Sequence, residues 1–398
     1  MRKVLEIILL FIAFKVTVLL VDIIYKHFPV QLIHFEHLAI EDVEFNDIYY
    51  STRPGNDKIL LLEKEVVLIN TGSLPSDSVF RLRIAELIRK IAVYRPMATG
   101  IDLYFEQDKD PDIDRMLGEA ISEQSNIVLA KDKNMVRNQK FRSAHFGIVN
   151  FPISKKYGET VREYYNYAIN EKDTLLSFAL QLSRLKDPSI NPSESIEYLR
   201  YSCVYKGYYN VFGTGDSLTY NNFPAIEAKD VLNDRDSLLT SKLIKDKIVI
   251  LGHLGRDSMF SIWDSEDKFM VPTDSSLIHN RLLMPGAVIH ANAVQAMIND
   301  IHFSEMKGWR NELITDLILI IFLLIFYSVH HKFILHELIN LLIIFGSTIP
   351  IVFFLGNWLM MFGIYYRTGS LFLQIAFILE FVEIADGIKK KFIDRKKR

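Results

Sequence analysis

Residues 65–70 read Glu-Val-Val-Leu-Ile-Asn, and Thr71-Gly72 follows them at once. A short apolar run rich in β-branched residues that ends at a turn signal is typical of a buried strand. Beyond the turn, apolar side chains recur at the spacing of one helix face, at Phe80, Ile84, Leu87, Ile88 and Ile91. This stretch predicts a strand followed by a helix, with Ser76-Asp77-Ser78 placed to cap the helix.

The alternation continues after this first pair of elements. We predict a second strand over residues 99–105, a helix that begins at Pro111 and runs to about Glu123, and a third strand over residues 126–130. This alternating order predicts a mainly parallel sheet with flanking helices, which is the α/β class. Residues 131–173 are polar and aromatic and give no clear assignment.

The second half of the polar region carries fewer signals. Residues 174–186 have the apolar spacing of a helix, and the Tyr-rich residues 198–212 alternate as in an antiparallel strand or hairpin. The clearest strand in the chain covers residues 247–251 and ends at Gly252. Pro285-Gly286 then opens a last helix before the next long apolar segment.

Four apolar segments surround this region: residues 4–21 before it, and residues 313–329, 333–355 and a stretch ending near Ala385 after it. A helix needs about 20 apolar residues to cross a bilayer, because unpaired backbone groups cannot face lipid. We therefore predict four transmembrane helices, one N-terminal and three C-terminal. The expected divisions are an anchor over 1–24, an extracytoplasmic domain over 25–308, a three-helix region over 309–388 and a basic tail over 389–398.

Basic residues set the expected orientation of these helices. They flank the apolar segments at Met1-Arg2-Lys3, at His330-His331-Lys332 and throughout residues 389–398. Cytoplasmic flanks collect Lys and Arg, so both termini are expected inside and the large domain outside. A cleaved signal peptide is the alternative at the N-terminus, but no small-x-small cleavage site follows the apolar run. The tail is either a topology signal that attracts anionic membrane lipid or a docking peptide for a partner.

Composition narrows the setting further. A formal net charge of −2 argues against nucleic-acid binding. Cys203 is the only cysteine, so an intrachain disulfide is impossible and a large outer domain must rely on its core. Asn191-Pro192-Ser193 is not a glycosylation site, because proline stands at its middle position. We expect a multi-pass protein of the bacterial inner membrane with its large domain in the periplasm.

A series of landmarks then resembles one receptor family in order along the chain. They are Phe45 to Pro54, Val66 to Asn70, Phe80 to Arg83, Gly100 to Phe105, Lys247 to Gly252, Asp257, Pro272, and Met284 to Asn292 (Met-Pro-Gly-Ala-Val-Ile-His-Ala-Asn). Together with the span count, they are similar to the sensory extracellular domain associated with cyclases and histidine kinases, type two (CHASE2). The resemblance extends to about Ala385. It implies a periplasmic α/β sensor between one N-terminal span and three C-terminal spans.

The chain departs from the family pattern at two points. Asn70-Thr71-Gly72 stands where the family usually has an Asp after the first strand, which puts that part of a family site in doubt. No cyclase, kinase or phosphatase domain follows the last apolar segment, so we expect a sensor whose output lies in a separate cytoplasmic signalling protein. Family analogy also implies a homodimer.

Candidate ligand-binding residues follow from the predicted sheet. The carboxyl ends of parallel strands face the usual ligand crevice. We therefore propose a binding set for an unknown small-molecule or protein ligand, made of Asn70, Asp102, His253, Asp257 and His290. The alternative is that Asp102 and His290 are buried side chains satisfied by backbone groups.

Other motifs carry no defensible chemistry. Gly252-His253-Leu254-Gly255 follows a strand but lacks the Gly-Lys-Ser/Thr ending of a phosphate loop. His34-Phe35-Glu36-His37 has metal-binding residue types without a helix-spaced zinc pattern, and no Gly-x-Ser-x-Gly elbow appears. We expect no cofactor, no metal and no enzymatic activity.

Charged residues inside the predicted spans are costly and therefore informative. Lys15 lies deep in the first span, Asp316 lies at a comparable depth in the second, and Glu380 lies in the last. We predict a contact of Lys15 with Asp316 or with Glu380 that fixes how the helices pack. The alternative is that the flexible Lys15 side chain extends to the membrane surface.

Two functions remain in competition at this point. The first is a non-enzymatic receptor whose outer domain binds a ligand and shifts the first span relative to the last three. The second is a scaffold subunit of an envelope protein complex, in which the outer domain binds protein. A small deep pocket would favour the receptor, and a broad exposed apolar face would favour the scaffold.

Overall fold

The computed structural model describes residues 8–18, 64–76, 79–105, 109–133, 141, 144–153, 160–170, 173–192, 194–199, 201, 223–254, 267–272, 284–301, 303–306, 308–332, 339, 342–343, 346, 349–366, 371, 374–375, 377–378, 380–384 and 386–387. The chain forms two compact units, one over Tyr50–Ser304 and one over Met1–Tyr49 with Glu305–Arg398. The landmark Phe45 to Pro54, Cys203, most of the predicted 198–212 hairpin and the basic tail lie outside the described residues.

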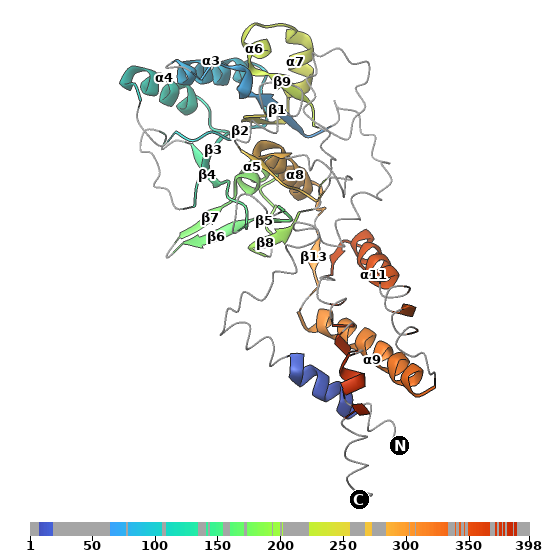
Figure 1. The fold of residues 1–398 in the computed structure, drawn as a ribbon. Coiled ribbons are helices and arrows are strands. Elements are labelled where there is room, and N and C mark those ends of the chain that lie inside the picture. The colour runs from blue at the N-terminus through green and yellow to red at the C-terminus, as the bar shows by residue number, and fades with distance from the viewer. Residues whose placement is uncertain are drawn as a thin grey trace, which may run out of the picture. The chain divides into compact units, whose positions relative to one another are not determined.

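A six-stranded parallel sheet forms the centre of the first unit (Figure 1). Its spatial order is β4 (His145–Ile148), β3 (Ile127–Lys131), β2 (Ala98–Ile101), β10 (Ile248–Gly252), β1 (Val66–Asn70) and β9 (Ala225–Glu227). Every neighbouring pair is parallel. The predicted α/β class is confirmed, and so are the strands expected around residues 65–70, 126–130 and 247–251.

Helices cover both faces of this sheet, as the direction of the chain crossovers requires. The connections β1–β2, β2–β3 and β9–β10 all move the same way across the sheet, so right-handed crossovers place their helices on one face. These helices are α3 (Phe80–Val93), α4 (Pro111–Ser122), α6 (Ala228–Leu232) and α7 (Ser237–Ile244). The return from β4 to β9 runs the other way, and its helix α5 (Phe178–Lys186) packs on the opposite face beside α8 (Gly286–Ile298).

Residue types differ between the two faces of the sheet. The face toward α3 and α4 carries large aliphatic side chains, such as Ile69 and Leu251, in one continuous core. The face toward α5 and α8 carries Gly100, Gly147 and Gly252. A Cβ atom at any of these glycines would meet an atom of α5 or α8 within 2.6 Å. The glycines therefore let α5 and α8 lie directly against the strands, where their side chains reach the end of the sheet.

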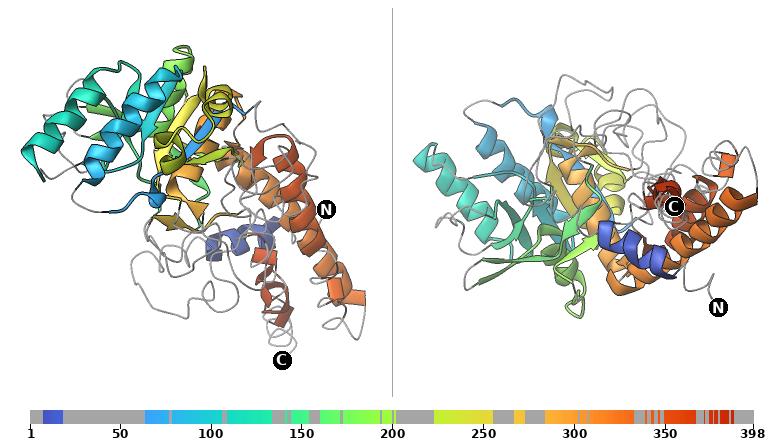
Figure 2. Two further views of the ribbon diagram at one scale, coloured as in Figure 1. Left: turned by 90° about the horizontal axis from the view of Figure 1, so that it is seen from above. Right: turned by 60° about the horizontal axis from the view of Figure 1, so that its bottom comes forward.

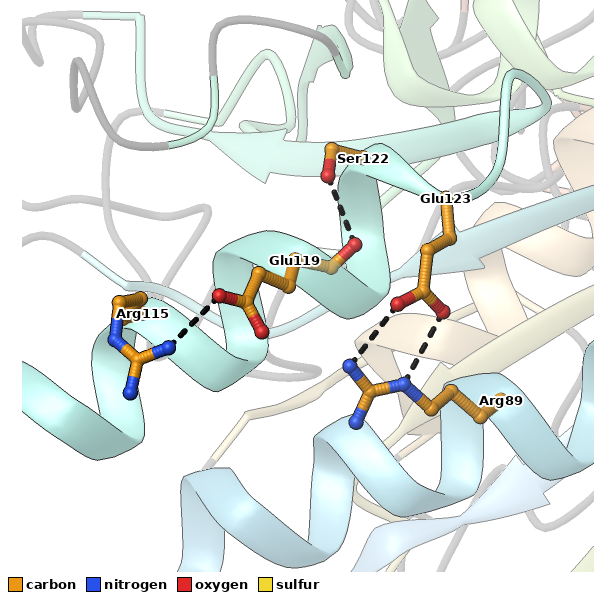
Figure 3. Close-up of polar contacts among 5 residues, drawn as sticks. All are labelled: Arg89, Arg115, Glu119, Ser122 and Glu123. Atoms are coloured by element: carbon orange, nitrogen blue, oxygen red, sulfur yellow. Dashed lines mark hydrogen bonds and ion pairs between the residues drawn. The ribbon is translucent and has the colours of Figure 1, made fainter.

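Helices α3 and α4 lie side by side in both orientations (Figures 1 and 2). At their exposed ends, Arg89 donates two hydrogen bonds of 3.1 Å to Glu123, and Arg115 pairs with Glu119 one turn away (Figure 3). Such exposed pairs stabilise a protein by about 0–1 kcal/mol. Between the helices, Arg81 forms an ion pair with Asp114, and both side chains are buried.

Small two-stranded sheets and a 3₁₀ turn also belong to the first unit. The antiparallel pairs are β5 (Glu163–Tyr165) with β8 (Ile196–Tyr198), β6 (Tyr167–Asn170) with β7 (Asp173–Leu176), and β11 (Lys268–Phe269) with β12 (Met284–Pro285). The 3₁₀ turn η4 (Thr71–Ser73) follows β1 directly.

Three sequence-based expectations need correction. Strand β2 ends at Ile101 rather than Phe105, so Asp102 lies just beyond the strand. Helix α5 begins at Phe178 because residues 173–176 pair as β7 and Ser177 caps the helix through Leu180 N. Val79 is the N-cap of α3 and makes no side-chain cap bond, so the expected cap is wrong. Strand β4 lies within the region that gave no assignment.

The second unit is helical. Its elements are a helix over Ile8–Val18, α9 (Gly308–Lys332) and α11 (Ile349–Met361), together with the short strands β13 (Ser304–Glu305) and β14 (Ile364–Tyr365). Among the described residues, one helix is long and apolar enough to cross a membrane, over Gly308–Val329. It corresponds to the second predicted span, and the set of four spans stays a prediction. Phe14 belongs to the apolar cluster of this unit, together with residues of α9 and with Leu371, Ile375 and Ile378.

The charged side chains of the predicted spans also lie in the second unit. Lys15 Nζ donates to Asp316 Oδ1 at 2.7 Å, and both side chains are about a third exposed. Glu380 is exposed. Of the two contacts expected for Lys15, the structure therefore forms the one with Asp316.

Reversing this ion pair should show whether it fixes helix packing. Lys15→Asp and Asp316→Lys are each expected to lower the thermal unfolding midpoint of the full chain in detergent, because each places like charges together in an apolar setting. The double exchange should recover most of the loss. A double variant no more stable than the single variants would show that the pair contributes nothing, and Glu380→Gln serves as the control outside the pair.

Candidate functional site

A cavity of about 490 Å³ lies at the carboxyl ends of β2 and β10. Its polar lining consists of Asp102, Asn150, His253, Asp267 and His290. Its apolar and aromatic lining consists of Leu103, Tyr104, Val149, Phe151, Ile153 and Phe269. This volume and mixture of walls are typical of a small-molecule site. The position matches the edge at which open parallel sheets hold ligands.

Asp102 supplies a largely buried carboxyl group to the cavity. Its backbone N–H donates to Leu251 O at 2.8 Å, which holds the residue at the end of β2 beside β10. The side chain is only 9 % exposed, and Oδ2 has no hydrogen-bond partner among the described residues. Burial raises the pKa of Asp102 well above its usual value, and the negative charge of Asp267 raises it further. The carboxyl group is therefore held toward its neutral, protonated form.

His290 faces Asp102 from α8. Its ring stacks on Phe151 with centroids 5.1 Å apart and also contacts the rings of Tyr164 and Phe178. The side chain is 2 % exposed, and burial lowers the pKa of His290 to about 3. The imidazole is therefore neutral at physiological pH.

The hydrogen bonds of His290 orient its ring. Tyr164 Oη lies 2.8 Å from His290 Nδ1 and also accepts from Ala179 N at 3.4 Å. We assign the Tyr164 hydroxyl as the donor to Nδ1, which leaves the imidazole proton on Nε2. Nε2 lies 3.9 Å from Asp102 Oδ2, beyond the range of a direct hydrogen bond. A ligand atom that approaches both groups would find an imidazole N–H and a carboxyl group.

Asp267 lies in space beside Gly286, the first residue of α8. It was not among the site residues predicted from the sequence. Its carbonyl accepts from Gly286 N at 2.9 Å, and a Cβ on Gly286 would lie 2.9 Å from its carboxylate. Gly286 thus lets the carboxylate approach the positive end of the helix dipole. Asp267 has a φ of 59°, which Asp tolerates better than most residues. Only the Pro285-Gly286 pair hinted at a close approach here.

The remaining predicted site residues differ in their placement. His253 follows β10 directly and lines the cavity together with Asp102 and His290. Asn70 does not line it. Its Oδ1 accepts from Gly72 N and Leu254 N, and its Nδ2 donates to Glu227, so it joins the ends of three strands. Asp257 and the His34–His37 stretch lie outside the described residues. The described residues contain no cluster of three His, Cys, Asp or Glu residues that could bind a metal.

The two buried groups have opposite effects on stability as pH changes. The unfolded chain protonates His290 below about pH 6.5, whereas the folded chain does so only near 3, so this group costs stability as pH falls through that window. The folded chain keeps the Asp102 proton above 3.8, where the unfolded chain has lost it. Asp102 therefore costs stability as pH rises above about 3.8.

Asp102→Asn isolates the second effect. Asparagine has the shape of the protonated carboxyl group and does not ionise, so the variant should match wild type near pH 4 and become increasingly more stable above it. Thermal unfolding of the full chain from pH 4 to 8 measures the difference. Asp246→Asn, at an exposed residue, is the control and should show no such divergence. A constant difference across the range would contradict a raised pKa.

Comparison with known proteins identifies the family. A family model described as the CHASE2 domain matches residues 18–329, which is most of the chain. No match was found among the curated proteins, and none among the solved structures. CHASE2 domains are extracellular sensory domains of membrane proteins. The match confirms the resemblance carried by residues such as Gly100 to Phe105 and Met284 to Asn292, and the chain belongs to the CHASE2 domain family.

Proposed function

We propose that this chain is a non-enzymatic receptor of the bacterial inner membrane, whose periplasmic domain binds a ligand in the cavity between Asp102, His253 and His290. Ligand binding changes the packing of its transmembrane helices, and a separate protein at the cytoplasmic face receives the signal. The topology has four spans with both termini in the cytoplasm. The cavity is the observation that carries the proposal, because it places buried polar groups at the carboxyl edge of a parallel sheet.

Helix α8 and the residues after it lead along the chain from the cavity to the predicted second span. His290 lies on α8, and after this helix Phe303 N donates to Tyr198 O at 3.2 Å. Three residues later, Met306 N donates to Tyr365 O at 3.0 Å. Thr315 on α9 and Tyr366 are joined by a buried 2.8 Å hydrogen bond. Phe303 therefore shares in the hydrogen bonding of the outer domain and Met306 in that of the helical unit, and the two residues are close in sequence.

The route carries a signal only under a thermodynamic condition. A ligand shifts an equilibrium between two packings only if it binds one of them more tightly. A ligand that moves the His290 ring would bind the two packings with different affinity, because the ring packs tightly against Phe151 and Phe178. A shift at the ring is then passed to α8 and α5, which pack on one another.

Filling the cavity tests the proposal directly. The full chain in detergent is screened with a fragment library balanced between cations, neutral compounds and anions, using thermal stabilisation and ligand-observed NMR. Val149→Trp places an indole into the cavity, since Val149 lines it, whereas Val93→Trp adds the same bulk at a 76 % exposed position of α3. Fragments should bind wild type and Val93→Trp and fail to bind Val149→Trp.

Two results would overturn the proposal. A library without any fragment that Val149→Trp excludes would show that the cavity binds no ligand. Purification from native membranes that recovers only envelope proteins, held through the outer domain, would favour the scaffold function. A cytoplasmic signalling protein that is lost when residues 389–398 are deleted would support the receptor.

A further inference from the structure

One carboxyl group of the cavity has an oxygen without a partner in the described part of the chain. Asp102 lines the cavity, its side chain is only 9 % exposed, and its Oδ2 is buried without a hydrogen bond. Its backbone N–H donates to Leu251 O, which fixes the residue at the end of β2. Buried polar atoms are nearly always hydrogen-bonded, so an unpartnered oxygen beside a cavity points to a ligand.

An imidazole N–H stands opposite this carboxyl group. With Tyr164 as the donor to His290 Nδ1 at 2.8 Å, the ring proton of His290 is on Nε2. Nε2 lies 3.9 Å from Asp102 Oδ2, which is too long for a direct hydrogen bond. Both residues line the cavity. A ligand there can therefore bond with both groups, whereas the two groups do not satisfy each other.

Both groups are held in their uncharged forms. Burial is the main cause that raises the pKa of Asp102 well above its usual value, and burial lowers the pKa of His290 to about 3. A hydroxyl group of a ligand both donates and accepts, so it complements the uncharged carboxyl group as well as the imidazole N–H. A charged ligand would lose its hydration here without meeting an opposite charge on Asp102 or His290.

Aromatic rings form the wall beside these polar groups. Phe151 stacks on the His290 ring with centroids 5.1 Å apart and meets Phe269 edge to face at 4.8 Å. The face of an aromatic ring is negative, and C–H groups on carbon atoms that also bear oxygen are slightly positive. A hydroxylated carbon ring therefore fits this corner, because it can present C–H groups to Phe151 and Phe269 and hydroxyl groups to Asp102 and His290.

We propose that the ligand of this cavity is an uncharged compound with adjacent hydroxyl groups on a carbon ring, whose hydroxyls bond with the Asp102 carboxyl group and His290 Nε2 and whose C–H face lies on Phe151 and Phe269. This assignment rests on the proposed receptor function and specifies its ligand class. Hydroxyls on neighbouring carbon atoms can reach two groups 3.9 Å apart, one hydroxyl to each. A cavity of about 490 Å³ has room for such a ring.

Four probes that share a cyclohexane ring and differ in their polar groups test this assignment: cis-cyclohexane-1,2-diol, cyclohexanol, cyclohexylammonium and cyclohexanecarboxylate. Dissociation constants for the full chain in detergent are measured by ligand-observed NMR at pH 7. The diol is expected to bind about fivefold or more tightly than cyclohexanol, because it makes one more hydrogen bond to a buried group. Both charged probes should bind more weakly than cyclohexanol, because entry removes their hydration.

Two substitutions of Asp102 distinguish hydrogen bonding from charge. Asp102→Asn keeps a donor and an acceptor, so it should retain the preference for the diol over cyclohexanol. Asp102→Leu removes both, and it should bind the diol no more tightly than cyclohexanol. Glu86→Leu is the control, because Glu86 is exposed on α3 and does not line the cavity. It should bind all four probes as the wild type does.

Three results would overturn the diol assignment while the receptor function stands. One is tighter binding of a charged probe than of the diol, abolished by Val149→Trp. Another is loss of the diol preference in Asp102→Asn, which would mean that an ionised carboxylate is required. The third is a diol preference that survives in folded Asp102→Leu. If none of the probes binds, the diol assignment fails, and the fragment screen decides separately whether the receptor function fails with it.

Discussion

Gly147→Ala is expected to cost about 3 kcal/mol or more of folding free energy, an effect at the upper end of what overpacking produces. A Cβ at Gly147 would lie 2.3 Å from Phe178 Cα and 2.6 Å from Phe178 N. These are backbone atoms at the start of α5, so no side-chain rotation relieves the clash. The helix must move away from β4, and the Phe178 ring that contacts His290 must move with it.

The stability loss of Gly147→Ala is compared with the losses at two further glycines, measured by thermal and denaturant unfolding of the full chain. Gly100→Ala should cost less, because its new methyl group meets the ends of the Phe178 and Leu182 side chains, which can shift. Gly308→Ala meets nothing within 4 Å and should be nearly neutral. Equal losses for Gly147→Ala and Gly308→Ala would show that α5 does not press on β4. Loss of fragment binding in Gly147→Ala alone would connect this packing to the cavity.

The sheet face that carries Gly100, Gly147 and Gly252 also shows what the sequence could and could not predict about the fold. The strands and the helix spacing were readable, because buried parallel strands are continuous apolar runs and their helices repeat at three and four residues. β4 was not readable, because His145 and Phe146 are followed by Gly147, a residue that is depleted in strands. Glycine is required there by contact with α5, which is a tertiary cause that no local pattern records.

The residues of the candidate site also fall into those that the sequence could predict and those that it could not. His253 and His290 could be nominated because the carboxyl end of a strand and the start of a helix can be located from sequence, whereas Asp102 was expected inside a strand that ends before it. Asn70 also lies at the carboxyl end of a strand, but its side chain forms hydrogen bonds with Gly72, Leu254 and Glu227 and does not line the cavity. Tyr164 and Asp267 follow no strand of the parallel sheet and enter the site through β5 and through the turn before β11. Their roles depend on contacts between segments far apart in the chain.

Asp114→Ala is expected to destabilise the protein by about 3–5 kcal/mol, because it leaves the guanidinium of Arg81 buried without its carboxylate partner. The Asp114 side chain is 1 % exposed and that of Arg81 is 7 % exposed, so water cannot replace the lost contact. Asp114 also accepts from Lys109 N at 2.9 Å, which fixes the chain just before α4. Glu123→Ala breaks an ion pair between the same two helices at their exposed ends and should cost less than about 1 kcal/mol.

The double variant Arg81→Leu with Asp114→Leu distinguishes the net stabilisation by the ion pair from the cost of leaving one buried partner alone. Replacing a buried ion pair with apolar side chains of similar volume is often neutral or stabilising. The double variant should therefore recover most of what Asp114→Ala loses, as measured by the denaturant midpoint of the full chain. A double variant as unstable as Asp114→Ala would mean that the pair itself stabilises the packing of α3 on α4. Recovery would mean that the pair adds no net stability over apolar side chains of similar volume.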